Sequence, residues 1–125
     1  MKNILITTIA AVLVVGCGNP EADSALLVAA NKGNIEAVKQ HLAAGSDVNA
    51  NDRDGSTPLL YATREGRKEL AELLINEGAD VNAKDNQGRT PLDAAIFNKD
   101  FETEVADLLR KHGGKTGEEL KAEGK

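Results

Sequence analysis

The side chains that could do acid–base chemistry in this chain are His41 and His112. A histidine can transfer protons near neutral pH, but catalysis needs a partner within reach that orients it. The two histidines fall in different predicted helices, and no HExxH, CxxC or GxSxG motif and no phosphate-binding glycine loop is present. His112, beside Gly113, is more simply explained by an interaction with the C-terminal end of a helix dipole. These residues predict no catalytic site.

The acidic run from Asp47 to Asp52 could instead hold a cation, because it resembles the start of a calcium-binding loop. In such a loop the sixth residue is glycine and the twelfth is glutamate, whereas this chain has Asp52 and Pro58 there. An internal repeat explains these side chains better. We therefore expect no metal and no cofactor, and an enzyme is the weakest interpretation of the chain.

The overall charge limits the classes of partner. The chain has 15 Lys and Arg against 20 Asp and Glu, a net charge of −5, and its only aromatic residues are Tyr61, Phe97 and Phe101. Nucleic-acid binding depends on clustered basic residues and, for single strands, on aromatic stacking. We expect no nucleic-acid partner, and no motif indicates a small-molecule substrate.

Residues 1–20 differ in composition from the rest of the chain. Lys2 is their only charged residue, and two threonines alone interrupt an apolar run from Ile4 to Val15. As a helix this run would reach about 18 Å, whereas the hydrocarbon core of a bilayer is about 30 Å thick. The run has the length of a signal-peptide core, so residues 1–16 are predicted to be a signal peptide.

The end of this segment, Val14-Val15-Gly16-Cys17, resembles a bacterial lipobox. The resemblance implies diacylglycerol on the Cys17 sulfur, cleavage before Cys17 and usually a further acyl chain on the new N-terminus. Two or more acyl chains hold a protein firmly on a bilayer, where one binds only marginally. Gly18 follows where lipoproteins of the inner membrane often carry Asp, so we expect the outer membrane, with the protein facing the periplasm. An ordinary secretory signal or an uncleaved anchor is the alternative.

A second pattern is an internal repeat. The segment GSDVNANDRDGSTPL at 45–59 returns as GADVNAKDNQGRTPL at 78–92, with ten of fifteen positions identical at a spacing of 33. A catalytic motif seldom needs a second copy at a fixed interval, whereas a unit that stacks on its neighbour does. The pattern therefore indicates a repeat architecture.

The residues between the two copies predict a pair of helices. Thr57 can cap a helix N-terminus and Pro58 suits the first helical position, so a first helix begins there and ends at Gly66. Residues 67–77 then place leucines at helical spacing before Gly78, which predicts a second helix.

Equivalent helix pairs flank this unit, at 24–45, beginning with Ser24, and at 90–113, where two extra residues separate the helices. Helices of about eight to twelve residues are marginal alone in water, so each pair must be stabilised by stacking on the next. The chain holds three such pairs, about the minimum for a stable array.

The motif Asp-x-x-Gly-x-Thr-Pro-Leu, followed by two short helices and Gly-Ala-Asp-Val-Asn at a period of 33, resembles the ankyrin repeat over roughly residues 22–114. The resemblance implies an all-α solenoid of three stacked helix-turn-helix repeats, at about 24–54, 55–87 and 88–114. It leaves residues 17–23 as a lipidated N-terminus and short tether.

Three residues depart from the family pattern. Leu60 and Asp93 replace the usual histidine after Thr-Pro-Leu, which removes hydrogen bonds that often tie adjacent turns together. Tyr61 stands where a smaller aliphatic residue is common, so we expect a buried ring with the hydroxyl at an edge. We expect modest stability from these departures and no change of fold.

The resemblance also implies protein binding through the turn tips and the exposed sides of the first helices, which together form a concave face. The turn-tip positions are Arg53, Asp54, Ser56, Asn86, Gln87 and Arg89. The helix positions are Asn31, Lys32, Arg64, Glu65, Phe97 and Asn98. For each residue the alternative is a solvated side chain without a partner. Phe97 resembles a binding anchor, although it could instead pack against Phe101.

The remaining segment, residues 115–125, is a polar tail with Leu120 as its one large apolar residue, and it is expected to be disordered or a frayed helix.

The sequence as a whole predicts a membrane-tethered protein that mediates protein–protein interaction in the bacterial cell envelope. An immunity or inhibitor protein that occludes an envelope-acting effector or hydrolase is the alternative, and a neighbouring gene for a secreted hydrolase would favour it.

Replacing Cys17 tests the lipid anchor. Because no other residue can accept the diacylglycerol, Cys17→Ala should release the protein from membranes or block its maturation, as measured by membrane fractionation and by the mass of the N-terminus. Unaltered fractionation and processing of the variant would contradict the lipobox interpretation.

Overall fold

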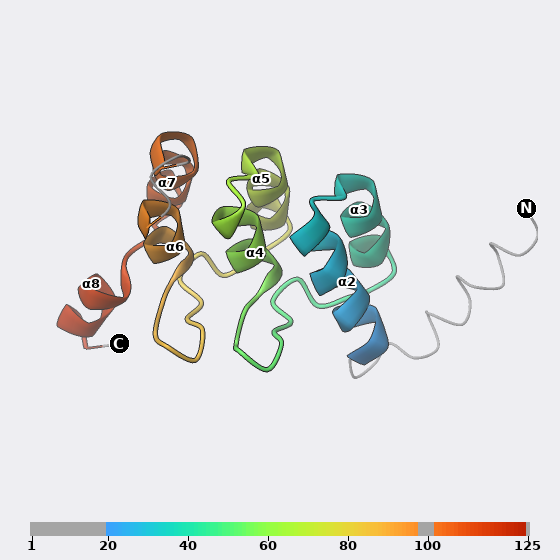
Figure 1. Cartoon of the computed structure of the whole chain (residues 1–125), viewed down its shortest axis with the longest axis horizontal. Coiled ribbons are helices and arrows are strands. Elements are labelled where there is room, and N and C mark those ends of the chain that lie inside the picture. Colours follow the sequence, from blue (N-terminus) through green and yellow to red (C-terminus); the bar gives the residue numbers. More distant parts are fainter. Residues whose placement is uncertain (1–19, 98–101, 125) are drawn as a thin grey trace, which may run out of the picture.

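The computed structural model describes residues 20–97 and 102–124, and within these ranges the chain consists of helices and turns without a strand (Figure 1). The helices are α2 (Pro20–Lys32), α3 (Ile35–Ala43), α4 (Pro58–Arg64), α5 (Lys68–Asn76), α6 (Pro91–Phe97), α7 (Glu102–Lys111) and α8 (Gly117–Ala122). The predicted signal peptide, Cys17, Asn98 and Phe101 lie outside the described residues. The expected all-α solenoid of stacked helix pairs is confirmed.

The three pairs α2–α3, α4–α5 and α6–α7 stand side by side along the long axis of the molecule (Figure 1). Helix α2 packs on α4 and α4 packs on α6, while α5 packs on α7, so the first helices form one layer and the second helices another. Gly33 and Gly66 end the first helices of the first two pairs with φ of 73° and 66°. Only glycine adopts this conformation without strain, and it lets the chain reverse within a few residues.

The core consists of residues that recur at the repeat period. Leu26, Leu59 and Leu92 of the three first helices are 0%, 1% and 1% exposed and belong to one continuous apolar cluster. The small residues that let these helices approach closely are Ala29, Ala62 and Ala95. The longest described helix has only 13 residues, so the shared core, and not the individual helix, stabilises the fold.

Two asparagines that the sequence did not single out fasten each long turn to the next repeat. The Oδ1 atom of Asn49 accepts a hydrogen bond from the Asp80 amide at 2.8 Å, and the Oδ1 atom of Asn82 accepts one from the Lys115 amide at 2.7 Å. Each asparagine also donates from Nδ2 to a backbone carbonyl of the same segment. The repeated Val-Asn pair therefore fixes the spacing of successive repeats.

The first helix is longer than the sequence predicts. Helix α2 begins at Pro20, four residues before Ser24, where the repeat pattern places the start. Proline suits the first turn of a helix, and Glu21 and Asp23 place negative charge near the positive end of the helix dipole. Only Gly18 and Asn19 stand between Cys17 and this helix.

The sequence predicts that the polar tail is disordered or a frayed helix, and the structure shows a capped helix, α8, beside the last repeat (Figure 1). The hydroxyl of Thr116 accepts a hydrogen bond from the Glu119 amide, and the Glu119 carboxylate accepts one from the Thr116 amide, which closes a capping box. Leu120 is 5% exposed, and an ion pair joins Lys115 to Glu123. Cap and buried leucine together order this short helix.

Truncating Leu120 tests whether α8 is part of the folded unit. Leu120→Ala should lower the free energy of unfolding by about 2 kcal/mol or more, because it removes a buried side chain and leaves a cavity. Val28→Ala is the control, since Val28 is 52% exposed and should change stability by less than about 0.5 kcal/mol. Urea unfolding followed by circular dichroism measures both, and equal effects would show that α8 does not contribute to the cooperative fold.

Candidate functional site

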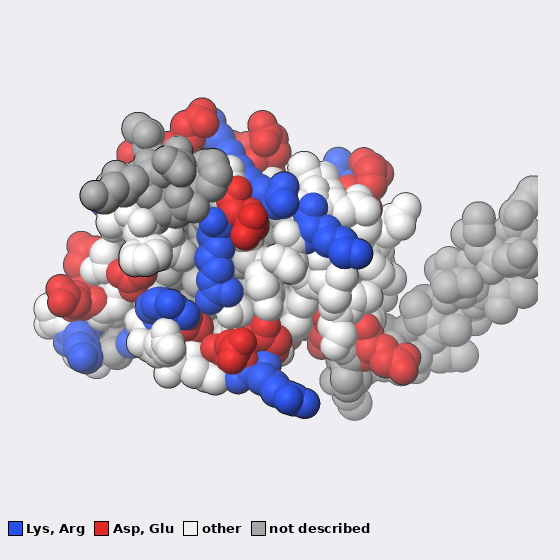
Figure 2. All heavy atoms as spheres, viewed as in Figure 1, with Lys and Arg blue, Asp and Glu red and all other residues white. Residues whose placement is uncertain are grey.

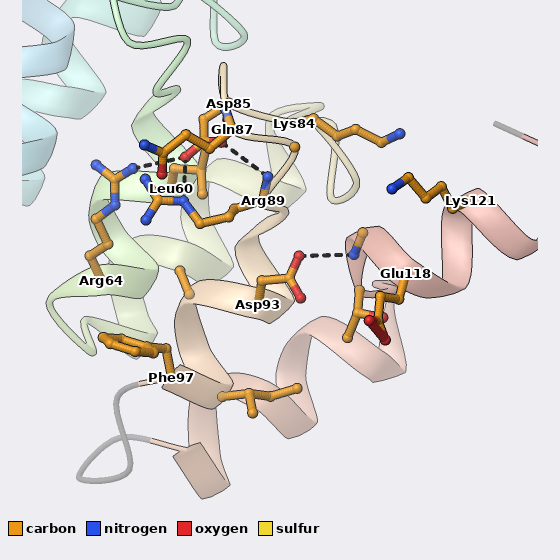
Figure 3. A pocket seen from close by; sticks show the side chains of 15 residues that line it. Leu60, Arg64, Lys84, Asp85, Gln87, Arg89, Asp93, Phe97, Glu118 and Lys121 are labelled. Atoms are coloured by element: carbon orange, nitrogen blue, oxygen red, sulfur yellow. Dashed lines mark hydrogen bonds and ion pairs between the residues drawn. The ribbon is translucent and has the colours of Figure 1, made fainter.

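A groove of about 1140 Å³ opens between α4, α6, α8 and the turn tip that precedes α6 (Figure 3). We call it the α6 groove. Its apolar part is formed by Ala94, Ile96 and Phe97 of α6, and Phe97 is 89% exposed. The groove is also lined by the basic residues Arg64, Lys84, Arg89 and Lys121, and Figure 2 shows Lys and Arg interspersed with Asp and Glu on one face of the molecule. The groove thus combines an exposed aromatic ring with basic side chains.

Two arginines of the α6 groove converge on one buried carboxylate. The Asp85 side chain is 1% exposed, and its Oδ2 atom lies 3.4 Å from Arg64 Nη2 and 2.9 Å from Arg89 Nε. Its Oδ1 atom accepts hydrogen bonds from the amides of Gln87 and Arg89, at 2.9 and 3.0 Å. One carboxylate therefore faces two guanidinium groups.

The charge state of Asp85 follows from these contacts. Burial on its own raises the pKa of a carboxyl group, but the hydrogen bonds from the amides of Arg89 and Gln87, together with the Arg89 guanidinium, outweigh it. The pKa of Asp85 is thereby held below its ordinary value of 3.8. The carboxylate stays ionised and keeps both arginines in place at neutral pH.

Arg64 is also held by Tyr61, whose ring centroid lies 5.6 Å from the guanidinium carbon. The Tyr61 hydroxyl donates a hydrogen bond to the Asp52 carboxylate, and the ring is half-buried against the core. The hydrogen bond to Asp52, reinforced by burial, raises the pKa of Tyr61 to about 12. Burial raises the pKa of Asp52, but the bond from Tyr61 and backbone amide bonds outweigh it and lower that pKa below 3.8.

Asp93 connects α6 to the segment that leads into α8. Its Oδ2 atom accepts hydrogen bonds from the amides of Thr90 and Gly117, at 2.9 and 2.8 Å, and the Thr90 hydroxyl donates to the Lys115 carbonyl at 2.6 Å. The sequence predicts a loss of hydrogen bonds where Asp93 replaces histidine. The structure adds to this prediction, because the shorter carboxylate makes a different set of bonds that fastens the C-terminal segment.

A smaller cavity of about 330 Å³ lies beside the α6 groove, between the turn tips at 52–56 and 85–89. Ser56 lines it but is only 1% exposed, and within the described residues its hydroxyl has no hydrogen-bond partner. Ser56 is therefore not the exposed contact that the sequence predicts, because the closed turn directs its side chain inward.

The structure brings several of the predicted contact residues together. Those in the α6 groove are Arg64, Gln87, Arg89 and Phe97. Those in the smaller cavity alone are Asp54, Asn86 and the buried Ser56. Those exposed outside both are Asn31, Lys32, Arg53 and Glu65. The prediction for Asn98 concerns a residue outside the described ranges.

Sequence reasoning missed the wall that α8 adds to the groove. The groove is lined by Thr116, which is the N-cap of this helix, by Glu118 and Lys121 within it, and by Lys84, which precedes the turn tip at 85–89. The Thr116-x-x-Glu119 spacing is the signal that could have found them, since it matches a capping box at a helix N-terminus.

Among the described residues, no three His, Cys, Asp or Glu side chains are grouped so that they could hold a metal ion. None of the described helices has the length and apolar character needed to cross a bilayer.

The Tyr61–Asp52 hydrogen bond predicts an alkaline titration with a defined sign. A raised tyrosine pKa means that protonated Tyr61 stabilises the fold fully below pH 10, and that this stabilisation is lost as the pH rises toward about 12. Tyr61 is the only tyrosine and the chain has no tryptophan, so tyrosinate absorbance reports this group alone. We expect a midpoint near 12 in the folded protein.

Asp52→Asn should move this midpoint toward 10, because it removes the charge that opposes ionisation of Tyr61. Asp107→Asn, on the exposed side of α7, is the control and should leave the midpoint unchanged. A wild-type midpoint near 10 with circular dichroism of a folded protein would show that the bond does not persist in solution.

Comparison with known proteins identifies the repeat. The family model described as ankyrin repeats (3 copies) matches residues 26–119, and no curated protein matches the chain significantly. The matched range includes the three helix pairs and reaches into α8. Ankyrin repeats generally mediate protein–protein interaction and are generally non-catalytic. The chain belongs to the ankyrin-repeat family.

Proposed function

We propose that this chain is a lipid-anchored adaptor of the bacterial cell envelope that binds a partner protein in the α6 groove. The observation that carries the proposal is the exposure of Phe97, at 89%, in a groove that also presents two arginines. Covering an exposed aromatic ring with a partner removes apolar surface from water and lowers the free energy of the complex. Aromatic and arginine side chains also contribute most of the binding energy of protein interfaces.

The arginines support the same proposal because they are already positioned. Asp85 holds both guanidinium groups through contacts of 3.4 and 2.9 Å, and Tyr61 lies against one of them. A side chain that is ordered before binding loses less conformational entropy when a partner arrives. The groove therefore offers a prepared surface and not a flexible one.

The proposed lipid anchor would place this binding at the membrane surface. Three backbone steps separate the predicted lipid-bearing Cys17 from Pro20, a reach of at most about 11 Å, and α2 begins at Pro20. The repeat stack consequently stays close to the membrane surface. Confinement to the bilayer raises the local concentration for a partner on the same membrane and strengthens the complex without new contacts.

Removing the Phe97 ring tests the proposed binding surface. Phe97→Ser should weaken partner binding by about thirtyfold, equivalent to about 2 kcal/mol for an aromatic anchor. Val28→Ser is the matched control, because Val28 is the other large apolar residue that is well exposed among those described, and it lies on α2 away from the groove.

The measurement is quantitative recovery of crosslinked envelope proteins with each variant, after circular dichroism has shown that both variants are folded. We expect Phe97→Ser to lose specific partners that Val28→Ser retains. Recovery of the same partners in the same amounts by both variants would exclude the α6 groove as the binding surface.

A further inference from the structure

The charges that line the α6 groove differ in sign from the chain as a whole. Its cations are Arg64, Lys84, Arg89 and Lys121, and its anions are Asp85, Asp93 and Glu118. The lining thus has one positive charge in excess, whereas the whole chain has a net charge of −5. The rest of the chain is correspondingly more acidic, so a basic partner would be attracted to other parts of the surface.

Two of the three anions in the groove are already used by the protein itself. Asp85 is 1% exposed in its side chain and accepts four hydrogen bonds or ion-pair contacts from Arg64, Gln87 and Arg89. Asp93 accepts backbone amide hydrogen bonds on Oδ2. A ligand entering the groove therefore meets the arginine side chains, which are 33% and 54% exposed, before it meets a buried carboxylate.

The cationic and apolar parts of the groove occupy different sides (Figure 3). Lys84 from the turn tip and Lys121 from α8 extend toward one another, and Arg64 and Arg89 lie beside Asp85. Phe97 lies on α6, away from the two lysines. A ligand that matches this arrangement has negative charge on one side and a large apolar group on the other.

We propose that the α6 groove selects an acidic polypeptide segment that also carries a large apolar side chain. Carboxylates of the segment pair with Arg64 and Arg89 and with the lysines that face each other, and the apolar side chain covers Phe97. The inference rests on the proposed function, in which the groove binds protein, and adds the chemical class of the partner. Complementary charge directs a partner to the right face and rejects the wrong one.

Peptide display on the mature lipidated protein in detergent micelles tests this specificity. The probe is a library of short random peptides, selected against the wild type and against two charge-matched double variants. Lys84→Glu/Lys121→Glu reverses two groove charges, while Lys39→Glu/Lys111→Glu makes the same change in net charge on α3 and α7, outside the groove. We expect Asp, Glu and large apolar residues to be enriched with the wild type and with the control variant, and acidic enrichment to be lost with the groove variant.

The affinity of a selected acidic peptide should fall by about tenfold or more in the groove variant and by about twofold or less in the control variant. Raising the salt concentration should weaken wild-type binding as well, because exposed charges are screened.

Two outcomes separate this inference from the proposed function. Selected peptides that lose affinity for Phe97→Ser but show no acidic enrichment would overturn the acidic specificity and leave the binding surface in place. An equal loss of peptide affinity in both double variants would have the same meaning. If no selected peptide depends on Phe97, the groove is not the binding surface, and both ideas fail.

Discussion

The fold depends on the contact between successive helix pairs. Helices of seven to thirteen residues cannot persist alone in water, so each pair is stabilised only when its neighbour covers its apolar face. The leucines at 26, 59 and 92 form that contact at the centre of the stack, where each is almost fully buried. An array of this kind always has two ends that no repeat covers, and the chain meets this constraint at one end with α8 and its buried Leu120.

The stacking of the helix pairs also determines the shape of the groove. Its walls come from α4, α6 and α8, which are far apart in the sequence, and side chains that bond to backbone fix their spacing. The Asn82 side chain accepts a hydrogen bond from the Lys115 amide, and the Asp93 side chain accepts one from the Gly117 amide. The Asn86 side chain donates from Nδ2 to the Arg53 carbonyl at 2.6 Å. A binding surface fixed in this way costs little to order when a partner arrives. The bonds that stabilise the stack are therefore also the ones that prepare the groove.

The sequence predicts the parts of this structure that depend on local chemistry. Thr57 and Pro58 begin α4, Gly66 ends it, and the period of 33 places the helix pairs, because caps and turns act over a few residues. The docking of α8 on the last repeat is not predicted, because a six-residue helix with one buried residue has no periodic apolar pattern that indicates a packed face. The inward side chain of Ser56 and the new bonds of Asp93 escape it too, since both depend on how a turn closes against distant residues.

The proposed lipid anchor and the α6 groove lie toward opposite ends of the stack, which sets the distance between them. Helix α2, which follows the predicted lipid-bearing Cys17, stands at one end of the stack, and α8 stands at the other (Figure 1). If Cys17 carries the proposed lipid, the two residues before α2 would keep the domain near the bilayer. The stacked repeats between α2 and the groove are joined by core contacts and hydrogen bonds. A partner bound in the groove is thus held at a distance from the anchor that the number of repeats sets. A flexible linker of the same length would not define that distance.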